Sequence, residues 1–218
     1  MIERGCGSMD IESAVKFPTE DENWVVKVLI GGIISLIPIV NLLATGFCLK
    51  VMKETINRTP KMPEWGDWGE LFVKGLIGAI ISFIYLLIPV IVIAAMTGGA
   101  VFSMGMRSGM PFTMMIGAMV IGGLLAVLFG FFVPMALAMY VSGDSISDAF
   151  RIKEVVSRIK SVLGEYITAY IVIILLSVLL LLISVIPIIG WLIATFGSFY
   201  VGVVAAHMFG EVYTSSVA

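Results

Sequence analysis

Long apolar stretches separated by short polar segments dominate the chain. A membrane-crossing helix needs about 20 consecutive apolar residues, because the hydrocarbon core is about 30 Å thick and each helical residue advances about 1.5 Å. Four stretches have that length, and they predict an all-α integral membrane protein, a helical bundle. The predicted transmembrane helices are 71–96, 113–141, 166–186 and 188–209.

Two similar heptapeptides interrupt apolar stretches near opposite ends of the chain. Residues 35–41 read Ser-Leu-Ile-Pro-Ile-Val-Asn, and residues 184–190 read Ser-Val-Ile-Pro-Ile-Ile-Gly. Proline cannot donate a backbone hydrogen bond and clashes with the carbonyl four residues before it, so each segment predicts a break or turn. We therefore expect Pro38 and Pro187 at hairpin tips, with Asn41 supplying hydrogen bonds at the first.

The positions of the basic residues favour a hairpin over a single crossing at 24–52. Basic residues collect in the short cytoplasmic loops of membrane proteins. A single crossing divides the 13 Lys and Arg residues 4 against 9. If the chain instead turns back at Pro38, only Arg107 lies outside and both termini are cytoplasmic. The arms have about 14 residues, or about 21 Å, which is less than the core thickness and predicts a re-entrant hairpin.

Two amphipathic surface helices are predicted, at about 10–17 and 145–163. Asp10 is a suitable N-cap for the first, and Pro18 ends it. Ser145 and Asp148 have the spacing of a capping box at the start of the second. Its apolar residues follow helical spacing and its other face is basic, so we expect it to lie in the plane of an anionic leaflet.

The two halves of the chain contain the same parts in the same order. The segment that begins at Ile11 resembles the one that begins at Ile146, and each leads to a Ser-x-Ile-Pro-Ile break. This pattern predicts one polytopic domain over 1–218 with a weak internal repeat of 10–56 and 145–211.

Small residues recur every four positions in two apolar stretches. Such ridges let another helix approach closely, which is a main source of helix association in lipid. Two interpretations remain open: packing within the chain, and an interface between copies of it. The ridges consist of Ala118, Gly122, Ala126 and Gly130, and of Ala194, Ser198, Gly202, Ala206 and Gly210.

The composition agrees with a membrane protein and argues against several other classes. Hydrophobic residues make up 60% of the chain and charged residues 13%, and the mean hydropathy is +1.10. No basic patch typical of nucleic-acid binding is present, so we expect no nucleic-acid partner. Cys6 and Cys48 form neither a metal spacing nor a disulfide framework. Met9 is followed by a natural helix start, so residues 1–8 are expected to be a start-site extension.

His207 and Glu211 are the most suggestive polar pair. They lie one helical turn apart, with Tyr200 on the same face, and could form a proton-sensitive pair near the inner surface. The alternative is a histidine that is simply hydrogen-bonded near a helix end. A single histidine and carboxylate without a nucleophile do not make an acid–base site.

Two further clusters have both a metal-binding and a structural interpretation. Glu64, Asp67 and Glu70 could attract a divalent cation, or could favour the positive N-terminus of a helix. Methionines between Met96 and Met115 offer thioether ligands for Cu(I), but without Cys or His beside them they suit flexible packing. We predict no catalytic, cofactor-binding or metal-binding residues. Phosphate-binding, zinc-protease and nucleophile-elbow motifs are absent, and no charge lies mid-span.

The connector before the second apolar stretch carries a resemblance to a known family. Its residues 63–72 read Pro-Glu-Trp-Gly-Asp-Trp-Gly-Glu-Leu-Phe, and Gly46 and Gly75 flank them at a distance. This pattern resembles a family of small polytopic membrane proteins of unknown function, found mainly in archaea and some bacteria. The resemblance implies a prokaryotic cell membrane and a start at Met9, and it implies no activity.

We therefore expect a multi-pass cell-membrane protein that is not an enzyme and needs no cofactor. Its leading functional interpretation is a scaffold or accessory membrane component, whose partners are the lipid bilayer and either a second copy of the chain or other membrane proteins. The alternative is a transporter or channel for a neutral or lipid-like solute, because discontinuous helices commonly build substrate sites.

Overall fold

The computed structural model describes residues 10–105 and 112–217, and the side chains of 96–115 are not among the described parts. The predictions for Cys6, Arg107, residues 1–8 and the methionine cluster lie outside the described residues. The chain forms two compact units. Unit 1 is Met1–Ala79 with Met135–Ala218, and unit 2 is Ile80–Pro134.

Helices make up all the regular structure of the described residues, and four of them are long and apolar enough to cross a membrane. This confirms the predicted all-α fold and the number of candidate spans. Their bounds are Trp68–Ala95, Ile116–Gly143, Leu163–Ser184 and Ile189–Val217.

The first helix, α1 (Ile11–Lys16), begins where the sequence predicts. The Asp10 carboxylate accepts hydrogen bonds from the backbone N–H groups of Glu12 and Ser13, at 3.1 and 3.4 Å, which satisfies two donors at the helix start. The chain then continues as a short 3-10 helix, η1 (Phe17–Glu20), with Pro18 in its first turn. The α-helix thus ends before Pro18, and the chain continues with 3-10 geometry.

Both proline segments separate two helices. Helix α2 (Trp24–Ser35) is followed by α3 (Asn41–Ile56), and α9 (Leu163–Ser184) by α10 (Ile189–Val217). The residue after each proline has a positive φ, 72° at Ile39 and 65° at Ile188. A β-branched residue rarely adopts this conformation. The two Ser-x-Ile-Pro-Ile segments therefore share an unusual backbone turn.

The middle of the chain differs from the predicted boundaries. Helix α4 (Trp68–Gly105) passes through Pro89 and continues nine residues beyond the predicted end at Met96. Its 38 residues extend about 57 Å. The prediction ended this helix at Met96, but the Gly and Ser residues that follow only lower the helix propensity and do not exclude a helix. The following stretch divides into α5 (Phe112–Gly130) and α6 (Val133–Gly143).

The predicted helix 145–163 is wrong as a single element. It consists of α7 (Ile146–Ala149) and α8 (Ile152–Ser161), and Val162 leads into α9. The capping box does not form, because Ser145 Oγ pairs with Ser147 Oγ at 2.8 Å and the Asp148 carboxylate pairs with Arg151 at 3.1 Å. That ion pair lies at the break between α7 and α8.

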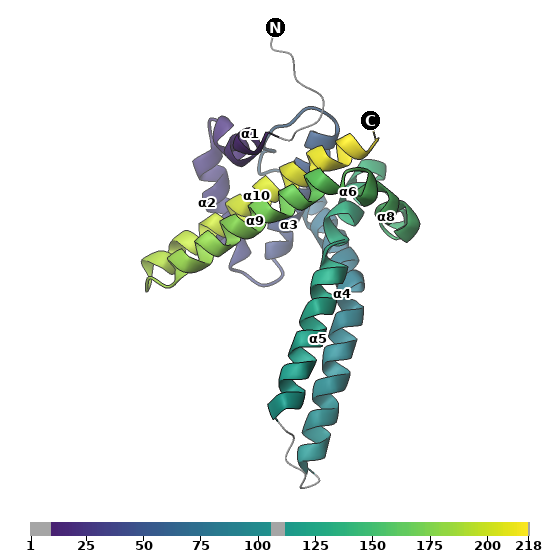
Figure 1. The fold of residues 1–218 in the computed structure, drawn as a ribbon. Coiled ribbons are helices and arrows are strands. Elements are labelled where there is room, and N and C mark those ends of the chain that lie inside the picture. Colours follow the sequence, from purple (N-terminus) through teal and green to yellow (C-terminus); the bar gives the residue numbers. More distant parts are fainter. Residues whose placement is uncertain (1–9, 106–111, 218) are drawn as a thin grey trace. The chain divides into compact units, whose positions relative to one another are not determined.

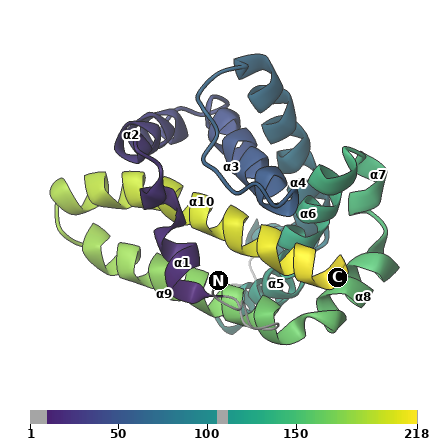
Figure 2. The same ribbon diagram turned by 90° about the horizontal axis from the view of Figure 1, so that it is seen from above.

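Helix α10 is the centre of unit 1. It contacts α9 along one side and α2 and α3 along another, and α1, η1 and α8 also contact it (Figures 1 and 2). Gly202 faces Cys48 of α3, and Gly210 faces Met52 and Thr55 of the same helix. This part of the predicted ridge of small residues therefore packs within the chain.

Helices α3 and α4 touch through their backbones at two glycines. A methyl group built on Gly46 would lie 1.9 Å from the carbonyl oxygen of Leu71, and one on Gly75 would lie 1.8 Å from that of Leu42. Both contacts are far below van der Waals distance, so only glycine allows this approach. The two glycines of the family-like pattern thus have a packing role.

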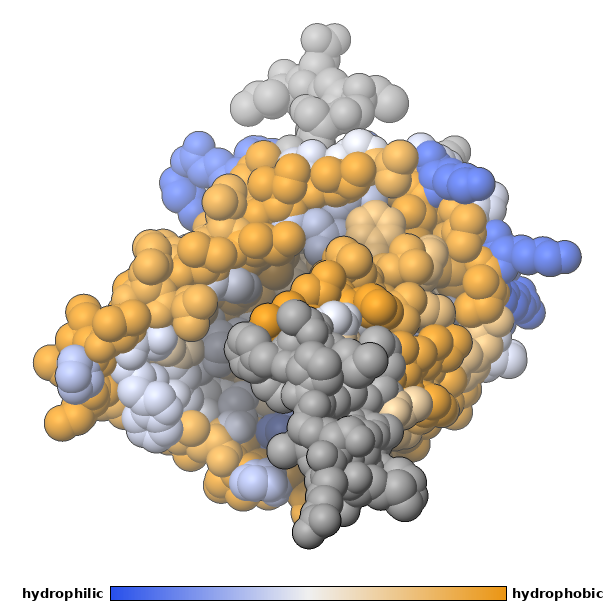
Figure 3. All heavy atoms as spheres, turned by 60° about the horizontal axis from the view of Figure 1, so that its bottom comes forward, coloured by the Kyte–Doolittle hydropathy of each residue, from blue (hydrophilic) through white to orange (hydrophobic). Residues whose placement is uncertain are grey.

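In unit 2, α5 packs on α4 through the other ridge. Gly122 faces the side chain of Ile93, and Ala118 is buried. Large apolar side chains elsewhere on α5 are exposed, including Leu124 and Val127. Apolar residues also cover most of the face in Figure 3. Because water-soluble surfaces rarely carry such continuous apolar area, this is the surface of a membrane-embedded protein.

We predict that Gly46→Ala lowers the free energy of unfolding by about 1–3 kcal/mol, because the new methyl group would force α3 and α4 apart. The measurement is thermal or denaturant unfolding in detergent. Gly164→Ala is the matched control, since no atom lies within 4 Å of a methyl group there and alanine favours the helix. Equal stability of the two variants would contradict the tight crossing.

Candidate functional site

Lys27 is a buried charge that joins three segments of unit 1. Its side chain is 3% exposed, and its Nζ lies 2.7 Å from both Asp21 Oδ2 and Glu64 Oε1. It also donates a hydrogen bond to the carbonyl of Met62 at 3.2 Å. Two carboxylates and a carbonyl replace the water that the ammonium loses, as a buried charge requires. The cluster holds α2, the segment before it and the connector 57–67 together.

Trp65 in the connector reinforces this junction. Its Nε1 donates to the carbonyl of Lys27 at 3.1 Å, and its ring stacks on Phe47 of α3 with centroids 4.5 Å apart. The ring of Trp68 also stacks on that of Trp65, with centroids 5.6 Å apart. Tryptophan rings suit the headgroup region of a membrane. The structure shows a half-buried Trp65 that packs on the protein and a more exposed Trp68.

The three acidic residues of the connector have different surroundings. Glu64 pairs with Lys27, and Glu70 pairs with Lys74 at 2.6 Å one turn along α4. Asp67 is exposed and has a φ of 47° just before α4 begins. The structure therefore pairs Glu64 and Glu70 with different lysines, and Glu70 lies in the first turn of the helix, as the structural interpretation expects.

The structure brings His207 and Glu211 together and adds two contacts that the sequence did not suggest. His207 Nε2 lies 3.6 Å from Glu211 Oε1, and Nδ1 lies 2.9 Å from Thr55 Oγ1 of α3. The ring of Phe17 stacks on the imidazole with centroids 4.0 Å apart and an interplanar angle of 8°. His207 is buried at 4% exposure. This histidine therefore joins α10 to α3 and η1.

Tyr200, predicted on the same face, makes a separate contact. Its hydroxyl donates to the carbonyl of Val15 at 2.7 Å, and its ring meets that of Trp24 edge-on at 6.3 Å. Tyr200 and His207 thus hold α1 and η1 on α10 at two points. Neither contact could be read from the sequence, because the partners lie more than 180 residues away in the chain.

Asn41 and the prolines lie at the turns. Asn41 is exposed as the first residue of α3, and its backbone N–H donates to the carbonyl of Ile37 at 3.0 Å. Ile39 beside it is 71% exposed, as Ile188 beside Pro187 is at 77%. Both turns therefore present apolar side chains to their surroundings.

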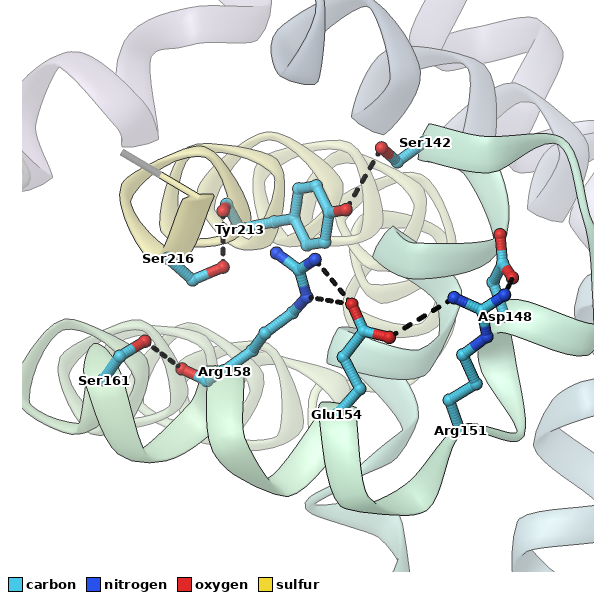
Figure 4. A network of polar contacts seen from close by, with 8 residues as sticks. All are labelled: Ser142, Asp148, Arg151, Glu154, Arg158, Ser161, Tyr213 and Ser216. Atoms are coloured by element: carbon cyan, nitrogen blue, oxygen red, sulfur yellow. Dashed lines mark hydrogen bonds and ion pairs between the residues drawn. The ribbon is translucent and has the colours of Figure 1, made fainter.

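A second polar network joins α8 to α10 and α6 (Figure 4). Arg158 donates to Glu154 Oε1 through Nε and Nη2, at 3.2 and 2.7 Å, and its guanidinium lies 5.1 Å from the centre of the Tyr213 ring. The Tyr213 hydroxyl donates to Ser142 Oγ at 3.1 Å. Arg151 approaches the other Glu154 oxygen at 3.5 Å. The hydrogen bonds from Arg158 lower the pKa of Glu154, and Arg151 adds to this effect.

These polar clusters all serve to connect helices. Lys27, His207 and Arg158 each bind partners from at least one other segment, and the described residues contain no group of three or more acidic, His or Cys side chains placed to hold a metal ion. The fold and clusters define a multi-helix membrane protein in which the buried Lys27, Thr55 and His207 contact other segments of the chain.

The chain belongs to the DUF4013 family, described as "Protein of unknown function (DUF4013)", which matches residues 30–193. This agrees with the resemblance to an uncharacterised family, and the tryptophan-containing connector lies within the matched residues. Neither a curated protein nor a solved structure matches the chain.

The Lys27 cluster gives a paired prediction. Asp21→Asn and Glu64→Gln each remove one carboxylate at the same 2.7 Å from the ammonium, but the Asp21 side chain is 20% exposed and that of Glu64 is 80% exposed. We expect a loss of about 1–3 kcal/mol for Asp21→Asn and about 0–1 kcal/mol for Glu64→Gln, because water screens the exposed pair. Chemical denaturation in detergent measures both, and equal losses would contradict the difference in burial.

The lowered pKa of Glu154 predicts a pH-dependent attachment of α8. The ionised carboxylate stabilises the network above its unfolded pKa of 4.5, and this contribution is lost as the pH falls through the lower folded value. A fluorophore at exposed Ser157→Cys, without the native cysteines, should report a change of environment below about pH 4.5.

The control for this titration is the same labelled chain carrying Glu154→Gln. Glutamine at position 154 carries no charge at any pH, so the transition should disappear or shift to another pH. An unchanged transition in that variant would assign the pH dependence to a different group.

Proposed function

We propose that this protein is a non-enzymatic scaffold or accessory component of a cell membrane. The observation that supports the proposal is the use of its buried polar groups. Lys27 is occupied by Asp21, Glu64 and a backbone carbonyl, and His207 by Thr55 and Phe17. Each group binds other segments of the same chain and so stabilises the fold, which supports a structural role for the protein.

The surface offered to partners is apolar. Helix α9 packs on α10 through residues such as Tyr166 and Ala169 near its start, while large side chains farther along it are exposed. In lipid, such a face associates with another helix through van der Waals packing. The exposed residues include Ile174, Leu175, Val178, Leu179, Leu181 and Leu182.

We also propose that α2 and α3 form a re-entrant hairpin with both chain termini in the cytoplasm. The 12 residues of α2 extend about 18 Å and the 16 residues of α3 about 24 Å, both less than the hydrocarbon core. Charged residues lie at the open end of the pair, where Lys27 meets Asp21 and α3 ends after Lys53. The turn is apolar, which suits a tip within lipid.

Labelling with a membrane-impermeant thiol reagent tests the topology, in a background lacking Cys6 and Cys48. Glu20→Cys should react only when the reagent reaches the cytoplasmic side. Ile39→Cys should resist the reagent on both sides of the membrane and react in detergent, because bilayer lipid would cover it. Labelling of Glu20→Cys from outside would show that 24–52 crosses once.

The scaffold role predicts a complex in native membranes. After gentle extraction into polymer-bounded nanodiscs, light scattering should give a protein mass above the 23.5 kDa of one chain, either from copies of the chain or from a co-purifying membrane protein. A monodisperse single chain with no companion would overturn the proposal.

The transporter alternative has a separate test. The proline turns and Asn41 motivate it, because interrupted helices commonly bind solutes. The test measures solute flux into liposomes that carry the purified chain. Flux that is lost with Asn41→Leu would show that the protein is a transporter and not a scaffold. We expect Asn41→Leu to leave permeability unchanged, since this side chain is exposed at the start of α3.

A further inference from the structure

Two lysines lie on one exposed flank of α8. Lys153 and Lys160 are seven residues apart, so two helical turns place them on the same side of the helix, about 10.5 Å apart along its axis. Both residues are exposed. Neither forms an ion pair with another described residue, whereas most basic residues near them do.

The other basic residues of this helix are already neutralised. Arg158 makes two hydrogen bonds to Glu154 and faces the Tyr213 ring, and Arg151 is shared between Asp148 and Glu154 (Figure 4). Arg158 lies about 140° around the helix from Lys153, so the two lysines point to a different side of α8 from this arginine. The uncompensated positive charge of the helix is therefore concentrated on Lys153 and Lys160.

The position of α8 directs these lysines to a membrane surface. The helix leads through Val162 directly into α9, a candidate membrane span that begins at Leu163. Val155 and Ile159 are buried, and α8 contacts α10, so the apolar face of α8 is held by the protein itself. This differs from a free amphipathic helix, whose apolar face would enter the lipid.

Exposed apolar residues lie close to the two lysines in the chain. Ile152 is 51% exposed at the start of α8, and Leu163 is 45% exposed where α9 begins. Such residues suit the boundary between headgroups and acyl chains, while lysine side chains extend their ammonium groups toward the headgroups. Each lysine thus has an exposed apolar residue within three positions of it in the chain.

We propose that Lys153 and Lys160 bind the phosphate groups of anionic phospholipids in the leaflet from which α9 enters the membrane. The ammonium groups supply charge-assisted hydrogen bonds to phosphate oxygens, and Ile152 and Leu163 contact the adjoining acyl chains. A free phosphate ion has the same charged group but no acyl chain. The site selects the lipid because it combines both kinds of contact.

Native mass spectrometry of the detergent-solubilised full chain tests the site, with phosphatidylglycerol and phosphatidylcholine as probes. The unmodified chain should bind phosphatidylglycerol more tightly. Lys153→Gln with Lys160→Gln should weaken that binding by about tenfold or more and leave phosphatidylcholine binding unchanged. Lys153→Arg with Lys160→Arg should retain it.

Arg58→Gln with Lys61→Gln is the matched control, because it removes the same charge from exposed positions of the connector. This variant should lose less than threefold in affinity. An equal loss in both pairs would indicate diffuse charge attraction and overturn the lysine site. Competition by millimolar inorganic phosphate would assign the lysines to the free ion instead. Thermal unfolding should be the same for all variants, because the substituted side chains are exposed.

Discussion

The packing of α10 against its neighbours is the interaction on which unit 1 depends. Helices α1, α2, α3, α8 and α9 and the 3-10 helix η1 all contact α10. His207 binds Thr55 of α3 and stacks on Phe17, Tyr200 binds the backbone of α1, and Tyr213 meets Arg158 of α8. Gly202 and Gly210 of α10 also face α3, so these two helices approach closely beside the His207–Thr55 contact.

Two kinds of contact hold the helices together: close backbone approach at glycines, and contacts between polar side chains. Backbone-to-backbone approach at Gly46 and Gly75 brings α3 and α4 together where the chain is apolar. Charged groups act nearer a helix end, as in the Lys27 cluster in the first turn of α2. The division follows from the solvent: close van der Waals packing is the main attraction available in lipid, whereas ion pairs need the partial hydration found near the surface.

Some sequence signals identified the right residues with the wrong neighbours. The amphipathic pattern of 145–163 correctly marks Val155 and Ile159 as one apolar face, but that face packs on α10 and the helix breaks on either side to allow it. Likewise, His207 and Glu211 do lie close together, yet the shorter contact of His207 is with Thr55. Periodicity describes a face and leaves the partner of that face open.

The sequence by itself determined the helical class, the four candidate spans, the Asp10 cap and the family resemblance, because length, apolar content and capping are local properties. Only the tertiary structure decided how Lys27 is neutralised, that Gly46 and Gly75 mark a helix crossing, and that two lysines of α8 have no ion-pair partner among the described residues. These features depend on residues distant in the chain, and their free energies arise only when packing removes water and sets the separation between helices.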